Sequence, residues 1–236
     1  MRALLLIQSP DDLALAEAAE SGADALILDL GAGESDRASA GKMTAKALLK
    51  LRLAAPLVPA YARIARVAEA DAELDAIMPV RPAGILLGDV GTGADLQQLS
   101  VKLSVREASF GFADGATKII ATVAGSPASV FELSSLAGKT QRLTGLIFGA
   151  DDLARALGGS SEAAPVACVR NLMLLAARAA GVVAIDAAAP RDIDGAHLRE
   201  LCAAAKRDGF EGKVAADRAQ LAIIHSMFKK DQEPNR

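Results

Sequence analysis

Short aliphatic runs alternate along the whole chain with longer segments in which apolar residues recur at helical spacing. Aliphatic runs of this length favour buried strands, and the periodic segments between them favour amphipathic helices. The alternation therefore predicts strand–helix units that build a parallel sheet. Eight such units can be counted. The predicted strands are 3–7, 24–30, 56–64, 83–89, 117–125, 143–148, 182–186 and 212–216.

The predicted helices fill the segments between these strands. The first, within 9–22, has clear end signals, because Ser9 can cap it, Pro10 suits its first position and Gly22 can end it. Pro59 lies inside the third strand and lowers its expected regularity. The other predicted helices are 35–53, 69–78, 95–107, 127–136, a short one from Asp151, 164–180, 194–207 and 217–228.

Eight strand–helix units within 236 residues are what an α/β fold of the (β/α)8 TIM-barrel type requires. An open doubly wound sheet usually has fewer strands and a glycine-rich phosphate turn after the first strand, and no GxGxxG occurs there. The sequence therefore predicts one barrel domain over residues 1–228, followed by a flexible C-terminal tail over 229–236.

Composition and charge narrow the classes of partner. Hydrophobic residues make up 52% of the chain and aromatic residues only 3%, so the predicted core is aliphatic. The 26 Lys and Arg residues are outnumbered by 29 Asp and Glu residues, and no basic block stands out, which argues against nucleic acid as a partner. The first apolar stretch, 3–7, is too short for a signal peptide or a membrane span, so we expect a cytoplasmic protein that does not enter membranes.

Charged residues stand at the ends of several predicted strands, where barrel enzymes place their active sites. They suit a Mg²⁺ site beside an anionic substrate, since hard cations prefer carboxylates and an arginine binds a carboxylate with two parallel hydrogen bonds. Each has a structural alternative: an Asp at a strand end is often only a helix N-cap, and Arg63 or Lys213 could be exposed rim residues. The residues are Asp29, Arg63, Asp89, Asp151, Asp152, Asp186 and Lys213.

Four segments in order, "SGADALILDL", "GLIFGADDLARALG", "LAARAAGVVAID" and "GFEGKVAADRAQL", resemble the citrate lyase beta-subunit-like branch of the HpcH/HpaI aldolase family. The resemblance covers nearly the whole chain. It implies a (β/α)8 barrel that assembles as a homo-oligomer, a trimer or hexamer. It also implies Mg²⁺-dependent cleavage or formation of carbon–carbon bonds in organic acids or acyl-CoA thioesters, in which the ion stabilises an enolate.

The resemblance assigns roles residue by residue. Asp152 matches the metal-binding aspartate of the family's "GAEDL", with Asp151 in place of the preceding glutamate. Arg63 matches the substrate-binding arginine of "VRVN", and Asp29 matches the first aspartate of "DLEDA", so we assign both to catalysis. The resemblance also matches Lys213 and Asp186, which we assign with Arg63 to substrate binding, and Gln220, to which we assign no role.

The chain departs from the family pattern around this site. The second metal-binding carboxylate of the family, a glutamate in an "IETA"-like strand end, aligns with Ala124, and a methyl group cannot bind Mg²⁺. Asp89, which replaces a lysine, could supply a carboxylate instead, together with Asp151. The other departures are Gly31 and Ala32 for Glu-Asp, Ala65 for asparagine, and Asp217 and Arg218 for His-Pro.

Three functional readings follow from the sequence. The first is a citrate-lyase-beta-like barrel that acts on an acyl-CoA or a hydroxy or keto acid and whose lyase activity is lost or altered. The second is a non-catalytic protein that associates with a catalytic paralogue or senses an organic acid or acyl-CoA through Arg63 and Lys213. The third is a conventional enzyme with a rewired Mg²⁺ site at Asp89 and Asp152.

Overall fold

The computed structural model describes residues 1–9, 11–30 and 37–229 and contains a closed eight-stranded parallel barrel. Neighbours in sequence are neighbours in the sheet, and the first strand closes the barrel by pairing with the last through Ala3–Lys213, Leu4–Val214 and Leu5–Ala215. The strands are β1 (Ala3–Ile7), β2 (Ala25–Leu28), β3 (Ala60–Ile64), β4 (Gly84–Val90), β5 (Lys118–Val123), β6 (Leu143–Phe148), β7 (Val183–Asp186) and β8 (Gly212–Ala215).

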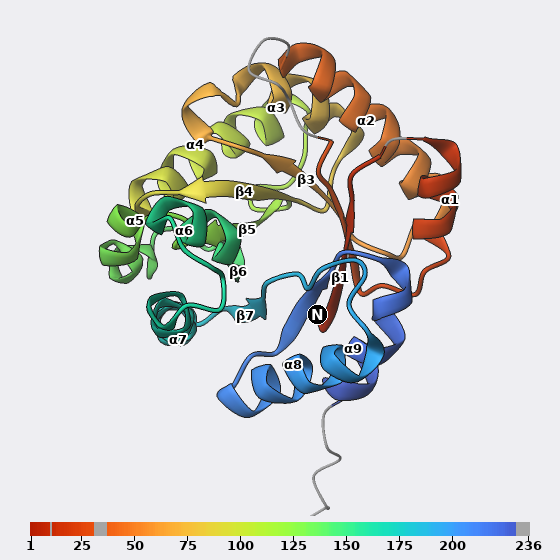
Figure 1. The fold of residues 1–236 in the computed structure, drawn as a ribbon. Coiled ribbons are helices and arrows are strands. Elements are labelled where there is room, and N and C mark those ends of the chain that lie inside the picture. Colours follow the sequence, from red (N-terminus) through yellow and green to blue (C-terminus); the bar gives the residue numbers. More distant parts are fainter. Residues whose placement is uncertain (10, 31–36, 230–236) are drawn as a thin grey trace, which may run out of the picture.

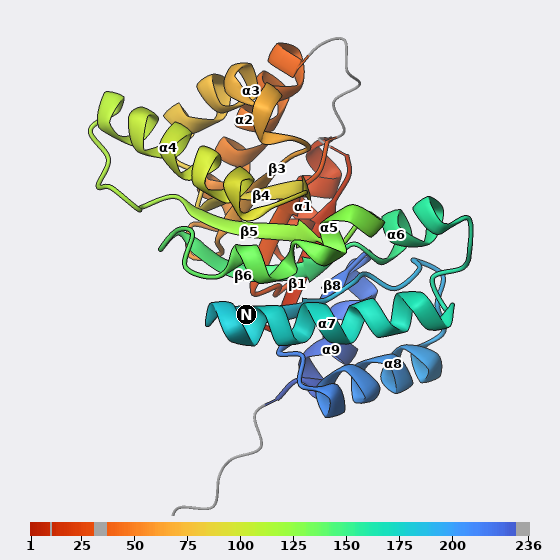
Figure 2. The same cartoon turned by 90° about the vertical axis from the view of Figure 1, so that its left-hand side faces the viewer.

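The helices form a ring around the strands (Figure 1). In the view turned by 90°, α5 and α6 lie beyond the carboxyl ends of the strands, on the right (Figure 2). The α-helices are α1 (Asp12–Ala19), α2 (Arg37–Ala54), α3 (Asp71–Ile77), α4 (Gly93–Ser109), α5 (Pro127–Phe131), α6 (Ala150–Leu157), α7 (Ala164–Ala180), α8 (Gly195–Asp208) and α9 (Leu221–Met227). Short 3-10 turns are η1 (Val67–Glu69), η2 (Met78–Val80), η3 (Leu133–Leu136) and η4 (Arg218–Gln220).

Two apolar clusters divide the core. One takes side chains from every strand, including Leu4, Ile27 and Tyr61, and fills the barrel interior. The other lies between the strands and the helices and includes Leu26 and Leu28. Because successive strand residues point to opposite faces, membership of a cluster fixes the direction of the polar side chains that follow on the same strand.

The eight predicted strands and the barrel are confirmed, and three helices differ in form. The predicted helix 69–78 is regular only over Asp71–Ile77, between two 3-10 turns, and Asp11 rather than Ser9 caps α1. The predicted helix 127–136 ends at Phe131 and continues as a 3-10 turn, where the Ser135 hydroxyl donates to Glu132 O in competition with a regular helix. The predicted helix 217–228 begins as η4, which Asp217 caps by accepting from Ala219 N. Pro10, Gly31, Ala32 and the predicted tail beyond 229 lie outside the described residues.

Within the part of the chain that the structure describes, no helix is both long enough and apolar enough to cross a membrane.

Candidate active site

Arg63 and Asp29 meet inside the carboxyl end of the barrel. Arg63 follows Tyr61 by two positions on β3, and Asp29 follows Ile27 by two on β2, so both point the same way as those interior side chains. The Arg63 Nη1 donates to Asp29 Oδ1 at 3.2 Å, and both side chains are half-buried. The structure thus brings together the two residues to which the sequence assigned catalysis.

Asp151 and Asp152 occupy the first turn of α6, directly after β6. Neither is the N-cap, because Gly149 holds that position and makes no side-chain capping bond. Carboxylates in a first helical turn are stabilised by the partial positive charge there. Asp152 Oδ1 accepts from Arg155 Nη1 at 2.7 Å, and 54% and 75% of the two side chains are exposed. This ion pair is therefore a solvated one.

Asp89 lies near the end of β4 with a left-handed backbone, at φ 44°. It is not the cap of the next helix either, since Thr92 caps α4. Its Oδ2 accepts from Arg66 Nε at 3.1 Å, again in a largely exposed pair. Each of the two strand-end aspartates proposed to share an ion is therefore bound to an arginine, Asp152 to one three residues away and Asp89 to one 23 residues away.

The donors present do not form a ready magnesium site. Ala124, directly after β5, is fully buried and offers only a methyl group at the position where the resemblance predicts a carboxylate. Among residues 1–9, 11–30 and 37–229, no three His, Cys, Asp or Glu side chains converge as a metal-binding group. Since Mg²⁺ requires several oxygen ligands in near-octahedral geometry, the side chains as they stand do not fit a tightly held ion.

Asp186 and Lys213 form a buried network on the outer side of the strands. Each is next in sequence to an interior residue, Ile185 or Val214, so both point toward the helices. Lys213 Nζ donates to Asp186 Oδ2 at 2.8 Å and to Ala187 O at 2.6 Å. From α7, Arg170 Nε donates to Asp186 Oδ1 at 2.9 Å.

This network holds a carboxylate with little access to water. Burial by itself would raise the pKa of Asp186, but the charges and hydrogen bonds of Lys213 and Arg170 outweigh it and leave the pKa below its usual value. Arg170 also reaches Asp208 Oδ2 at 2.7 Å and lies over the Phe210 ring, 4.2 Å from its centroid. The side chains that hold Asp186 therefore anchor it between β7, β8 and α7.

A cavity of about 780 Å³ opens at the carboxyl face, bordered by the loop that follows β7. Lys213 and Asp151 line it, together with His197 from α8. Arg191 of that loop donates from Nη2 to Gln8 Oε1 at 2.9 Å, joining the loop to the end of β1. This opening lies at the end of the barrel where residues of several strands can reach one ligand.

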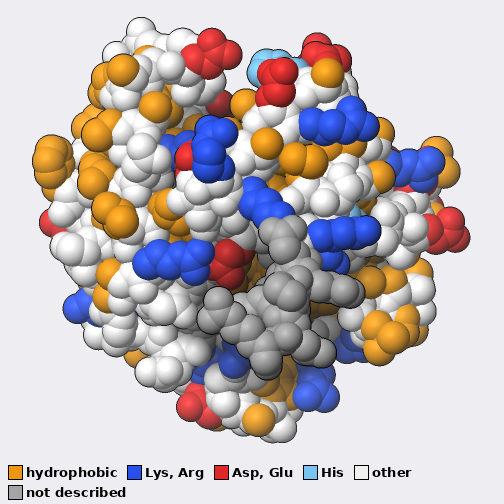
Figure 3. Space-filling view, turned by 90° about the horizontal axis from the view of Figure 1, so that it is seen from below, with side chains coloured by type: hydrophobic (Ala, Val, Ile, Leu, Met, Phe, Trp, Pro, Cys, Tyr) orange, Lys and Arg blue, Asp and Glu red, His pale blue; other side chains and the backbone are white. Residues whose placement is uncertain are grey.

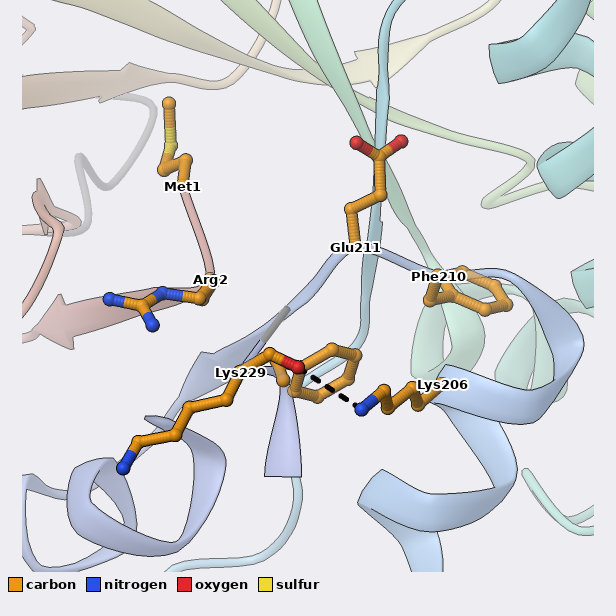
Figure 4. A pocket seen from close by; sticks show the side chains of 7 residues that line it. Met1, Arg2, Lys206, Phe210, Glu211 and Lys229 are labelled. Atoms are coloured by element: carbon orange, nitrogen blue, oxygen red, sulfur yellow. Dashed lines mark hydrogen bonds between the residues drawn. The ribbon is translucent and has the colours of Figure 1, made fainter. Parts of the chain in front are cut away.

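A second cavity, of about 590 Å³, lies at the opposite end of β1 and β8. Figure 4 shows Arg2, Lys206 and Glu211 around it, with Lys206 Nζ donating to Lys229 O at 3.1 Å. Basic side chains also gather near the middle of the face that Figure 3 shows from below. Because barrel enzymes carry their chemistry at the other end, we do not assign this cavity to the active site.

Sequence reasoning missed three polar residues of this region: Gln8, Arg170 and Arg191. Gln8 could have been found, because it stands directly after the first predicted strand. Arg170 carries no local signal, since its partners Asp186 and Asp208 lie 16 and 38 residues away in sequence. The resemblance did identify Gln220. Its side chain accepts from Ala216 N and donates to Pro190 O, and so connects the end of β8 to the loop that follows β7.

The closed parallel barrel, with an arginine–carboxylate pair inside its carboxyl end, defines a TIM-barrel protein, a class whose active sites lie at that end. The model of the HpcH/HpaI aldolase/citrate lyase family matches residues 2–217. The chain belongs to this family.

Individual relatives agree with this assignment. The chain is 30% identical over 240 residues to a (3S)-malyl-CoA thioesterase of Cereibacter sphaeroides, covering 96% of this chain and 76% of that protein. It is 28% identical over 218 residues to the citrate lyase subunit beta of Escherichia coli, covering 89% and 71%. The citrate lyase beta subunit of M. tuberculosis, solved with oxaloacetate and magnesium, superimposes with a TM-score of 0.74 at 25% identity, covering 97% and 96% of the chains.

Proposed function

We propose that the protein binds the carboxylate of an organic acid or of an acyl-CoA thioester at Arg63, and that its carbon–carbon lyase activity is altered or lost. The observation that carries the proposal is the Arg63–Asp29 pair inside the carboxyl end of the barrel. The names of the relatives support the substrate class, since one is a malyl-CoA thioesterase and another was crystallised with oxaloacetate.

Arg63 suits this role because a guanidinium has five N–H donors in a planar fork. One Nη1 hydrogen is directed to Asp29, and Arg63 remains partly exposed, so other donors are left for a ligand. The Asp29 carboxylate fixes the orientation of the guanidinium before a substrate arrives, which lowers the entropy lost on binding. Lys213 lines the cavity at the carboxyl face and adds positive charge there, and its bond to Asp186 holds it in place.

For the metal, we propose a weakened Mg²⁺ site with Asp152 as its main protein ligand and Asp151 and Asp89 as neighbouring carboxylates. Bound Mg²⁺ would polarise a carbonyl oxygen of the substrate. Two features support a weakened site: the methyl group of Ala124 and the arginine partners that compete for Asp152 and Asp89. A single carboxylate with water holds Mg²⁺ weakly, so a lyase reaction that depends on the ion would be slow.

A second candidate is a non-catalytic protein that senses the acid or associates with a catalytic paralogue. The fully buried Ala124 favours it, because a small apolar side chain stands at a strand end where the family carries a metal ligand. The two candidates differ in one respect that can be measured, namely whether ligand binding is followed by cleavage.

Calorimetric titration tests the proposal. Oxaloacetate and acetyl-CoA are titrated into the protein with and without Mg²⁺, and into the variants Arg63→Ala and Asp152→Ala. Arg52→Ala serves as the control, because Arg52 is an exposed residue of α2 that donates to Val80 O. We expect Arg63→Ala to weaken acid binding at least tenfold and Arg52→Ala to leave it unchanged.

Loss of Mg²⁺ binding in Asp152→Ala would support the metal site, and acid binding that survives in Arg63→Ala would overturn the proposed function. Product formation in a parallel assay would separate the lyase from the sensor.

A further inference from the structure

The guanidinium of Arg63 lies directly over Gly88 on the neighbouring strand β4. Gly88 follows the interior residue Leu86 by two positions, so its α-carbon faces the barrel interior beside Arg63. A Cβ built on Gly88 would lie 3.0 Å from Arg63 Nη2 and 3.4 Å from Arg63 Cζ. The first distance is tighter than most real Cβ contacts, so the Arg63 guanidinium would have to move by a few tenths of an ångström to make room for a side chain at 88.

The backbone itself does not require glycine at this position. The φ of Gly88 lies outside the left-handed region, whereas its neighbour Asp89 adopts φ 44° although it is not a glycine. Of the three atoms nearest to the built Cβ, two belong to the Arg63 guanidinium and the third is the backbone atom Ala65 O, at 3.4 Å. The tightest contact of a side chain at 88 would therefore be with Arg63, and the backbone conformation of Gly88 is not what requires glycine here.

We infer that Gly88 is a positioning residue for Arg63. Asp29, directly after β2, bonds one side of the guanidinium, and the open surface of Gly88 on β4 faces the other side, so the planar group is located between β2 and β4. Which N–H groups face the mouth of the barrel depends on this location. The effect on an organic acid rests on the proposed function, but the coupling between residues 88 and 63 does not.

A double-mutant cycle measures this coupling without any ligand. The urea midpoints of the wild type, Gly88→Ala, Arg63→Ala and the double variant are compared. Gly145→Ala is the matched control, because a Cβ there would lie 3.1 Å from the side-chain atom Ile185 Cδ1 and 3.4 Å from a carbonyl, Val183 O, with no arginine nearby. We expect Gly88→Ala to lower the midpoint in the wild type and to have little effect once Arg63 is truncated, whereas Gly145→Ala acts equally in both backgrounds.

Equal effects of Gly88→Ala in both backgrounds, or none in the wild type, would overturn the inference. If Gly88→Ala alone does not fold, folding of the double variant supports the inference and its failure to fold overturns it. Oxaloacetate titration adds a second readout: we expect about tenfold weaker binding in Gly88→Ala and none of this loss in Gly145→Ala. A wild type that binds no oxaloacetate would overturn the proposed function, while the urea cycle still decides the role of Gly88.

Discussion

At the scale of single residues, the Lys213–Asp186 pair is sensitive to change because both of its charges are buried. The two side chains are only 4% and 8% exposed, so removing the Lys213 charge leaves the buried Asp186 carboxylate with the charge of Arg170 alone. We expect Lys213→Met to lower the free energy of unfolding by about 3 kcal/mol in urea denaturation. The exposed Arg155–Asp152 pair is the control, and Arg155→Met should cost no more than about 1 kcal/mol. Equal losses in the two variants would contradict this account of burial.

We expect the protein to lose stability at low pH because of two buried carboxylates, those of Glu107 and Asp186. Burial would raise the pKa of Glu107, but the bonds from Arg142 and from Thr117 N outweigh it and lower the pKa, as happens for Asp186. A lowered pKa in the folded state adds stability that is complete above the ordinary values, 4.5 for Glu and 3.8 for Asp, and is lost as the pH falls below them. We expect the urea concentration at the unfolding midpoint to decrease once the pH drops below about 4.5. In Glu107→Gln this decrease with falling pH should be smaller.

The residue types of the site were predictable from sequence, but the direction of each side chain was not. The sequence identified these residues as candidates because they stand on or just after short apolar strands: Arg63, Asp29, Asp186 and Lys213. Side chains alternate between the two faces of a strand, so the position relative to the interior residues decides the direction. Arg63 and Asp29 stand two positions from an interior residue and point inward, whereas Asp186 and Lys213 stand one position from an interior residue and point outward. Strands of only four residues, such as β7 and β8, are too short for the alternation of apolar and polar residues to show from sequence which side chains point inward. The metal and substrate roles that the resemblance gives these residues stay predictions.

At the scale of elements, α2 and α3 pack so closely that a glycine is needed within a helix. A Cβ at Gly41 would lie 3.0 Å from Glu73 Cα and 3.1 Å from Ala76 Cβ. Alanine would ordinarily favour a helix by about 1 kcal/mol, but here the two helices would have to separate. We expect Gly41→Ala to destabilise the protein by about 1–3 kcal/mol in urea denaturation.

Gly195→Ala is the control for this packing effect. Gly195 begins α8, and a Cβ there meets Ile223 Cδ1 at 3.3 Å, the flexible end of a side chain. A gain in stability in Gly41→Ala would show that helix propensity outweighs the packing.

The elements were easier to predict than the site because each strand is marked by its own apolar run. All eight predicted strands are present, although 24–30 and 56–64 are trimmed to Ala25–Leu28 and Ala60–Ile64. Pro59, which lowered the expected regularity, precedes the observed β3. The predicted helices 127–136 and 217–228 differ where serine and aspartate side chains form hydrogen bonds with backbone groups in place of the regular helical bonds. The periodicity of apolar residues does not reveal this effect.

At the scale of the whole molecule, the surface carries large apolar side chains that suit self-association. Phe131 on α5 is 85% exposed and Leu57 before β3 is 94% exposed. We predict a homo-oligomer, a trimer or hexamer, as the family resemblance implies, with light scattering coupled to size-exclusion chromatography as the measurement. We expect Phe131→Glu or Leu57→Glu to lower the mass if its side chain lies in the interface. A monomeric mass at every protein concentration would contradict the prediction.

The pairing of β1 with β8 also bears on how the protein is made. Translation delivers β1 before the other strands of the barrel and β8 after them, so the backbone edge of Ala3–Ile7 stays unpaired with Gly212–Ala215 while the ribosome adds the intervening residues. Until then the nascent chain exposes an unpaired aliphatic strand of the kind that associates with other chains. Synthesis through β8 is therefore a condition for closure, and a chain truncated before Gly212 would form an open sheet that depends on chaperones to stay dispersed.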